Sequence, residues 1–184
     1  MTSSDYQQRL TGQFKRRITA QAEGRLDDAL ELCRLSIPDL IAHEFVPAAA
    51  ESLDAGVTLA ADVQRPEAVP ALLAPFDALM QAQRTRQVTS RIGRAEAAVA
   101  AAAGDRAAAD EAFGLALASA RNLDHAAVTA PILADYGRWL IESGRADDGA
   151  ELLGEARALF ERMGSTAWLE RLDAIMKTTT TVQG

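Results

Sequence analysis

Apolar residues recur along most of the chain three and four residues apart, which is the spacing of one face of an α-helix. Leu133, Tyr136 and Leu140 show it in one stretch, and Leu152 and Ala156 continue it beyond a short polar break. No stretch sustains the alternation of apolar and polar residues that indicates a half-buried strand. The pattern therefore predicts an all-α protein. Nine helices are expected, at residues 5–22, 26–42, 45–61, 67–82, 86–103, 106–121, 126–142, 146–163 and 166–177.

Two prolines fall inside predicted helices, Pro38 within 26–42 and Pro75 within 67–82. Proline has no backbone N–H group, and its ring collides with the preceding helical turn. We expect each proline to kink or split its helix.

A short motif recurs about every 40 residues between predicted helices. It begins at Gly24 and returns at Gly144. Weaker copies begin at Val63 and Gly104, so that successive copies start 39, 41 and 40 residues apart. Glycine tolerates the left-handed conformation that ends a helix, and a small residue then follows where two helices can cross closely. These small residues are Ala29, Ala68, Ala109 and Gly149. The motif predicts four helical hairpins, which bury their apolar faces by stacking.

The fourth copy carries the most complete pattern, at Leu133, Tyr136, Gly137, Leu140, Gly144, Gly149, Leu153 and Ala156. In this order the residues resemble a tetratricopeptide repeat (TPR). In the first copy Arg16 and Arg17 stand where that family has Leu-Gly, which implies an atypical terminal repeat that acts as a cap.

The resemblance implies a TPR-like superhelix of four hairpins of about 40 residues each, closed by a C-terminal capping helix that carries Trp168 and Leu172. One helical repeat domain would span residues 1–177, and residues 178–184 would form a disordered tail. The long period and the run that begins at Leu133 are similar to the C-terminal repeat region of bacterial ATP-binding regulators of the LuxR and maltose-activator kind, and of some adenylate cyclases.

Composition narrows the function. The 19 basic and 26 acidic side chains leave a formal charge of −7, which disfavours direct binding of nucleic acid. One cysteine and two histidines are too few for a disulfide framework or a structural zinc site. No apolar run is long enough for a membrane span, and we expect a cytoplasmic protein. Since phosphate-loop, nucleophile-elbow and zinc-protease motifs are also missing, we expect no enzyme activity, no cofactor and no metal.

Three places have side chains that could carry chemistry. His43-Glu44 and Asp124-His125 are acid-histidine neighbours, which are either proton-transfer sites or turn residues at helix boundaries. Cys33 lies within the predicted helix 26–42, where it is either a small core residue or a reactive thiol. The boundary and core interpretations are favoured.

The resemblance also implies a binding groove, because the first helix of each TPR hairpin lines the concave face. That pattern selects Phe14, Ile18, Leu53, Val57, Arg91, Arg94, Arg138 and Glu142, and Arg84 extends the arginine cluster among them. The apolar members would contact a ligand. Arg84, Arg91 and Arg94 share one helical face by their spacing, and an arginine can bind a carboxylate through two parallel hydrogen bonds. The alternative is a solvated face whose arginines pair with acids such as Asp77 or Asp124.

We therefore expect a non-catalytic protein-protein interaction module that takes a peptide or helix, with an acidic group, from a partner protein. The family likeness implies a role in bacterial signalling or transcription regulation. Two alternatives remain open: a structural scaffold that self-associates, and a sensor that closes around a small ligand.

Overall fold

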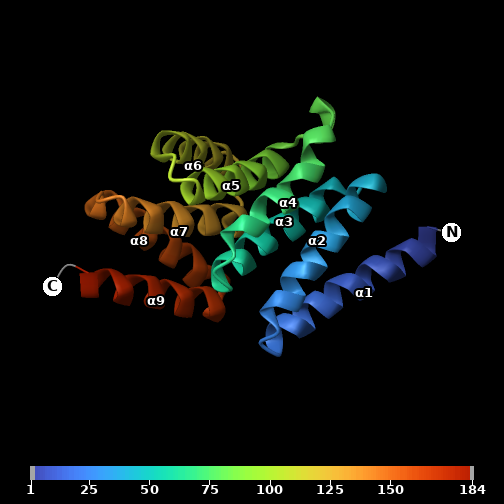
Figure 1. The fold of residues 1–184 in the computed structure, drawn as a ribbon, viewed down its shortest axis with the longest axis horizontal. Coiled ribbons are helices and arrows are strands. Elements are labelled where there is room, and N and C mark those ends of the chain that lie inside the picture. Colours follow the sequence, from blue (N-terminus) through green and yellow to red (C-terminus); the bar gives the residue numbers. More distant parts are fainter. Residues whose placement is uncertain (1–2, 183–184) are drawn as a thin grey trace.

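The computed structural model describes the backbone of residues 3–182 and the side chains of residues 11–177, and every regular element in that part is helical (Figure 1). The predicted all-α class is confirmed. The helices are α1 (Ser3–Ala22), α2 (Leu26–Ala42), α3 (Val46–Asp62), η1 (Pro66–Ala68), α4 (Val69–Leu73), η2 (Ala74–Ala78), η3 (Gln81–Gln83), α5 (Arg86–Ala102), α6 (Arg106–Arg121), α7 (Ala126–Glu142), α8 (Ala146–Met163) and α9 (Thr166–Val182). No described helix is both long and apolar enough to cross a membrane.

Most helices end at a residue in the left-handed conformation, and these residues are spaced at multiples of 20. They are Gly24, Glu44, Gln64, Gly104, Asp124, Gly144 and Gly164. After Gly24 the amide of Arg25 donates to the carbonyl of Ala20 at 2.8 Å, and the same bond joins Arg145 to Leu140. This arrangement is a Schellman motif, which satisfies carbonyls at the helix end. The 40-residue period therefore describes a pair of helices, and the first helix of each pair is followed by the same turn.

The sequence pattern places the turn of the second repeat copy one residue too early. The pattern starts this copy at Val63, but Gln64 has the positive φ of 56°. Correspondingly, Val69 rather than Ala68 is the buried residue at the start of the next helix. Because Gln64 lacks the conformational freedom of glycine, the pattern could not mark it as the turn residue.

The prediction of one continuous helix at residues 67–82 is wrong. The segment is split into η1, α4, η2 and η3, and the backbone becomes extended at Leu79. Pro66, Pro70 and Pro75 each lie in the first turn of one of the short helices, where the missing N–H group has no intrahelical acceptor to bond. By contrast, Pro38 does not split α2. Because Pro38 has no N–H group, the carbonyl of Arg34 lacks its helical hydrogen bond. Both residues are exposed, so water can bind that carbonyl instead.

The helices of a hairpin pack most closely where glycine or alanine lies at the crossing. Between α7 and α8, a Cβ atom on Gly149 would lie 2.5 Å from the carbonyl oxygen of Gly137, so the two backbones touch. Between α5 and α6, a Cβ atom on Gly93 would lie 3.0 Å from that of Ala116. The hairpin axes are therefore held close by residues without bulk.

The capping helix closes the array and also returns to its middle. The Trp168 ring stacks on Phe160 of α8 with centroids 4.7 Å apart, and Leu172 is fully buried. Arg171 reaches α3, where it forms an ion pair with Asp62 and donates to a backbone carbonyl. In Figure 1 the first turns of α9 accordingly lie beside the lower end of α3, although the two are far apart in sequence.

The last helix, α9, is longer than the sequence pattern predicts. The pattern ends the last helix at residue 177, whereas α9 continues to Val182 and so includes most of the predicted tail, 178–184. Residues 183 and 184 of that tail lie outside the described residues.

Candidate binding groove

The centre of the molecule holds an ion triad built from three parallel repeats. Asp54 of α3 and Arg94 of α5 occupy equivalent positions, 40 residues apart, and Asp135 of α7 follows Arg94 by 41 residues, one residue beyond the equivalent position. Arg94 is 0% exposed, and its Nη1 lies 2.7 Å from Asp54 Oδ1. Its Nη2 lies 2.7 Å from Asp135 Oδ2. The repeat thus places one positive side chain between two negative ones.

Each nitrogen atom of the Arg94 guanidinium donates a hydrogen bond. Nε donates to Asp135, Nη1 donates to both the side chain and the carbonyl oxygen of Asp54, and Nη2 donates to Thr58 Oγ1 at 3.0 Å. A buried charge costs several kcal/mol unless it is paired and hydrogen-bonded in this way. The triad therefore holds α3, α5 and α7 in one register.

Two members of the triad, Arg94 and Asp135, are held in their charged forms. Burial by itself would raise the pKa of Asp135, but attraction to Arg94 and then to Arg138 outweighs it and leaves the pKa below its usual value. Burial would likewise lower the pKa of Arg94, and attraction to Asp135 and Asp54 raises it instead. The charges of Arg94 and Asp135 therefore stabilise each other.

Helix α9 covers part of this inner face. The guanidinium carbon of Arg94 lies 5.9 Å from the centroid of the Trp168 ring, and that of Arg171 lies 5.2 Å from the same ring. Arg171 also donates to the carbonyl of Thr58 at 3.1 Å. The start of α9 therefore occupies, within the same chain, some of the space that a TPR groove would offer to a ligand.

The uncovered part forms what we call the inner groove, a pocket of about 220 Å³ between α3, the start of the split fourth segment, α5, α6 and α7. Its lining consists of Val57, Ala61, Pro66, Val69, Ala98, Ala101, Ala102, Phe113, Asp135, Arg138, Trp139 and Glu142. The small alanines keep the floor open. At the rim Arg138 donates to Glu142 at 3.2 Å, and both side chains are exposed.

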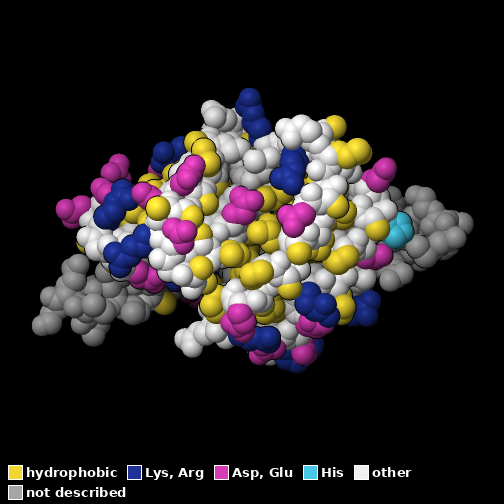
Figure 2. Space-filling view, turned by 45° about the horizontal axis from the view of Figure 1, so that its top comes forward, with side chains coloured by type: hydrophobic (Ala, Val, Ile, Leu, Met, Phe, Trp, Pro, Cys, Tyr) yellow, Lys and Arg dark blue, Asp and Glu magenta, His cyan; other side chains and the backbone are white. Residues whose placement is uncertain are grey.

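The face in Figure 2 shows a similar mixture of side chains. Hydrophobic side chains are spread across its centre, and acidic and basic side chains lie both among them and around the margins. Protein-binding surfaces combine apolar and charged side chains in this way.

The structure brings together three of the predicted groove residues. Val57, Arg138 and Glu142 line the inner groove, while Leu53 is fully buried in the core between α3 and its neighbours. Phe14 and Ile18 are exposed, but they lie on α1 and do not line this groove.

The predicted arginine face does not exist as such. Arg84 precedes α5, and its Nη2 donates to the carbonyl of Phe76 at 3.1 Å. Arg94 is enclosed by Asp54 and Asp135, so neither a ligand nor solvent can reach it. These two aspartates, rather than Asp77 or Asp124, form its ion pairs. Only the helical positions could be inferred from sequence, because an arginine's partners depend on which helices lie beside it.

Arg91 is the other buried member of that set. It is 5% exposed, and its Nε and Nη1 have no hydrogen-bond partner among the described residues. Such groups are rare in proteins, because a buried donor without an acceptor loses its hydrogen bonds to water and gains none in the protein. Arg91 and Arg94 lie one helical turn apart on α5. Arg94 is paired and hydrogen-bonded, whereas two nitrogen atoms of Arg91 lack hydrogen-bond partners.

The sequence analysis missed Asp54 and Asp135. A partial signal was present: Asp54 and Arg94 are 40 residues apart and have opposite charge. Equivalent positions of neighbouring repeats lie side by side in a stacked array. Comparing the charge at equivalent positions would have predicted the Asp54–Arg94 pair but not Asp135, which is one residue out of register.

The other candidates prove to be turn and core residues. Glu44 and Asp124 are turn residues with positive φ, and the neighbouring His43 and His125 stand at a helix end and a helix start. Cys33 is fully buried, and burial raises the pKa of its thiol to about 11. No cluster of metal-ligating side chains occurs within the described part of the chain.

These observations define an all-α protein of stacked helical hairpins with a groove between its inner helices. Comparison with protein-family models and with characterised proteins finds no match to the chain. The geometry of the groove is thus the basis on which a function can be argued.

Proposed function

We propose that the chain is a TPR-like, non-catalytic interaction module whose inner groove binds a peptide or helix of a partner protein. The observation that carries the proposal is the combination of an open, alanine-lined floor with an exposed ion pair at its rim, Arg138–Glu142. An amphipathic helix binds such grooves by its apolar face, and charges at the rim fix its register.

The rim pair can exchange partners at little cost. Exposed ion pairs contribute only about 0–1 kcal/mol, so Arg138 can leave Glu142 for a carboxylate of the partner. Arg94 beneath does not exchange partners, because it is fully buried and each of its guanidinium nitrogen atoms donates a hydrogen bond. A rigid floor lowers the ordering cost of binding.

The likeness to the repeat regions of bacterial regulators supports a setting in cytoplasmic signalling or transcription regulation. In that setting, an acidic peptide in the groove would be the signal that a regulator transmits.

A displayed library of short peptides, selected on the full chain, tests the proposal. Selected peptides are then titrated against Arg138→Glu and against Ala102→Trp, which fills the groove from an exposed lining position. The matched controls are Arg34→Glu, an exposed arginine that also pairs with a glutamate of its own helix, and Ala118→Trp, an exposed alanine of α6 outside the groove lining.

We expect both groove variants to weaken peptide binding by about tenfold or more, since loss of one charge-assisted contact has about that effect. Both controls should bind as the unaltered chain does. The proposal fails if selection enriches no peptide, or if the groove variants bind as well as their controls.

A further inference from the structure

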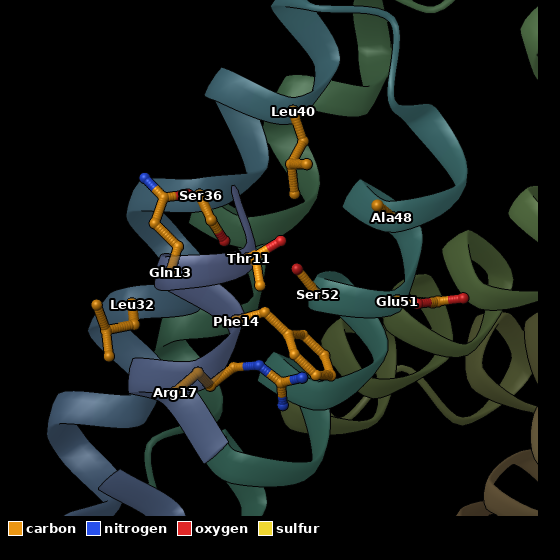
Figure 3. Close-up of a pocket in the computed structure, with 10 residues that line it drawn as sticks. All are labelled: Thr11, Gln13, Phe14, Arg17, Leu32, Ser36, Leu40, Ala48, Glu51 and Ser52. Carbon is orange, nitrogen blue, oxygen red and sulfur yellow. The ribbon is translucent and has the colours of Figure 1, made fainter. Parts of the chain in front are cut away.

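A second pocket lies at the other end of the molecule, between α1, α2 and α3, and we call it the α1–α3 pocket. Its volume is about 250 Å³ (Figure 3). The lining residues are Thr11, Gln13, Phe14, Arg17, Leu32, Ser36, Leu40, Ala48, Glu51 and Ser52. None of them lines the inner groove, so an inference about this pocket is independent of the proposed function.

The Phe14 ring is the main apolar surface of the pocket. It projects from α1 into the space between the three helices in Figure 3, yet 53% of the residue is exposed. Leu32 and Leu40 of α2 and Ala48 of α3 complete the apolar walls. A large exposed ring inside a concave site favours an apolar occupant, because covering it removes hydrocarbon from water.

Arg17 gives the same pocket a positive charge without a counterion. Only 9% of Arg17 is exposed, its guanidinium carbon lies 4.9 Å from the Phe14 ring centroid, and its Nη1 donates to the neutral Gln21 at 3.0 Å. Among the described side chains no carboxylate pairs with it. A guanidinium so deeply buried is normally paired with an anion, as Arg94 is here.

The remaining polar groups do not neutralise Arg17. Glu51 lines the pocket, but in Figure 3 its carboxylate points away from Phe14 and Arg17. Gln13 Oε1 is buried and has no hydrogen-bond donor. The pocket therefore offers one unpaired cation and one unpaired acceptor within mainly apolar walls.

We propose that the α1–α3 pocket binds a small apolar monocarboxylic acid. The carboxylate pairs with Arg17, and the hydrocarbon part covers the Phe14 ring and contacts Leu32, Leu40 and Ala48. Guanidinium binds carboxylate with two parallel hydrogen bonds, which satisfies the donors that Gln21 leaves open. The volume is below the roughly 300–1,000 Å³ of pockets for drug-sized ligands, which limits the acid to a short chain or a single ring.

Isothermal titration calorimetry on the full chain tests this with two acids, hydrocinnamate and hexanoate, and with the uncharged hydrocinnamyl alcohol and hexanol. The variant Arg17→Met removes the charge and retains an unbranched side chain. Its matched control is Arg16→Met, because Arg16 is the neighbouring residue of α1 and is exposed. A second variant, Ala48→Leu, reduces the pocket volume and leaves Arg17 in place. Circular dichroism verifies that each variant retains its helices.

We expect saturable binding of at least one acid at millimolar or lower concentration. Binding should weaken about tenfold or more in Arg17→Met and in Ala48→Leu, remain unchanged in Arg16→Met, and be about tenfold weaker for the matching alcohol. The proposal is overturned if neither acid shows saturable binding, if Arg17→Met and Ala48→Leu bind as the unaltered chain does, or if the alcohols bind as well as the acids.

Discussion

At the scale of residues, Arg91 and Arg94 show that burial alone does not define the role of a charged side chain. Both lie on α5 one turn apart. Arg94 pairs with two carboxylates and donates four hydrogen bonds, while two nitrogen atoms of Arg91 have no hydrogen-bond partner. One arginine therefore joins three repeats, and the other carries a desolvation cost without compensation.

This contrast predicts opposite effects of the same substitution. Arg94→Met should lower the free energy of unfolding by about 3–5 kcal/mol, because Asp54 and Asp135 would remain buried without their counterion. Arg91→Met should raise it by about 1–3 kcal/mol, because it removes donors that have no acceptor. Urea unfolding followed by circular dichroism measures both values. A loss of stability in Arg91→Met as large as in Arg94→Met would contradict the assignment.

The buried thiol of Cys33 gives a prediction about pH. Its pKa is about 11 in the folded chain, owing to burial, and about 8.5 in an unfolded chain. Because the folded pKa is the higher one, the contribution to stability is fully present below the unfolded value and is lost as the pH rises toward 11. Urea unfolding across this interval should show declining stability, and the decline should be smaller in Cys33→Ala. Equal slopes for the two proteins would contradict a buried, protonated thiol.

At the scale of elements, the crossing of α7 and α8 depends on glycine. Gly149→Ala would place a Cβ atom 2.5 Å from a backbone oxygen that cannot rotate away, and we expect a loss of about 1–3 kcal/mol or more in unfolding free energy. Gly154→Ala, on the exposed side of the same helix, has no atom within 4 Å and should gain up to about 1 kcal/mol. Thermal unfolding of the two variants compares them directly. If they shift the midpoint in the same direction, the close crossing is not what holds α8.

The elements that sequence could predict are those with unbroken local signals. The helical spacing in α7 and α8 and the turn at Gly144 appear in the pattern as they do in the structure. The segment 67–82 was predicted as one helix because its apolar spacing is helical. Each proline there is compatible with the first turn of a short helix, so the number of breaks could not be read from the spacing.

At the scale of the whole molecule, the contact between α9 and α3 closes the array. Arg171 and Asp62 are partly exposed, and their ion pair is screened, so it should contribute no more than about 1 kcal/mol. We expect Arg171→Glu to speed amide hydrogen exchange in α9, and the charge swap Asp62→Arg/Arg171→Glu to restore slow exchange. Exchange that stays fast in the swap would show that Trp168, rather than the ion pair, positions α9.

By itself the sequence determined the helices outside residues 67–82, the left-handed turns at Gly24, Gly104 and Gly144, the 40-residue period and the charge at each position. These depend on contacts within about one helical turn, which local residues specify. Only the tertiary structure decided that Arg94 lies between Asp54 and Asp135, that Arg91 is buried with two nitrogen atoms that have no hydrogen-bond partner among the described residues, and that α9 covers part of the inner face. Those contacts join residues 40 or more positions apart, and they depend on the small rotation between one repeat and the next, which accumulates along the array and is not encoded in any single turn.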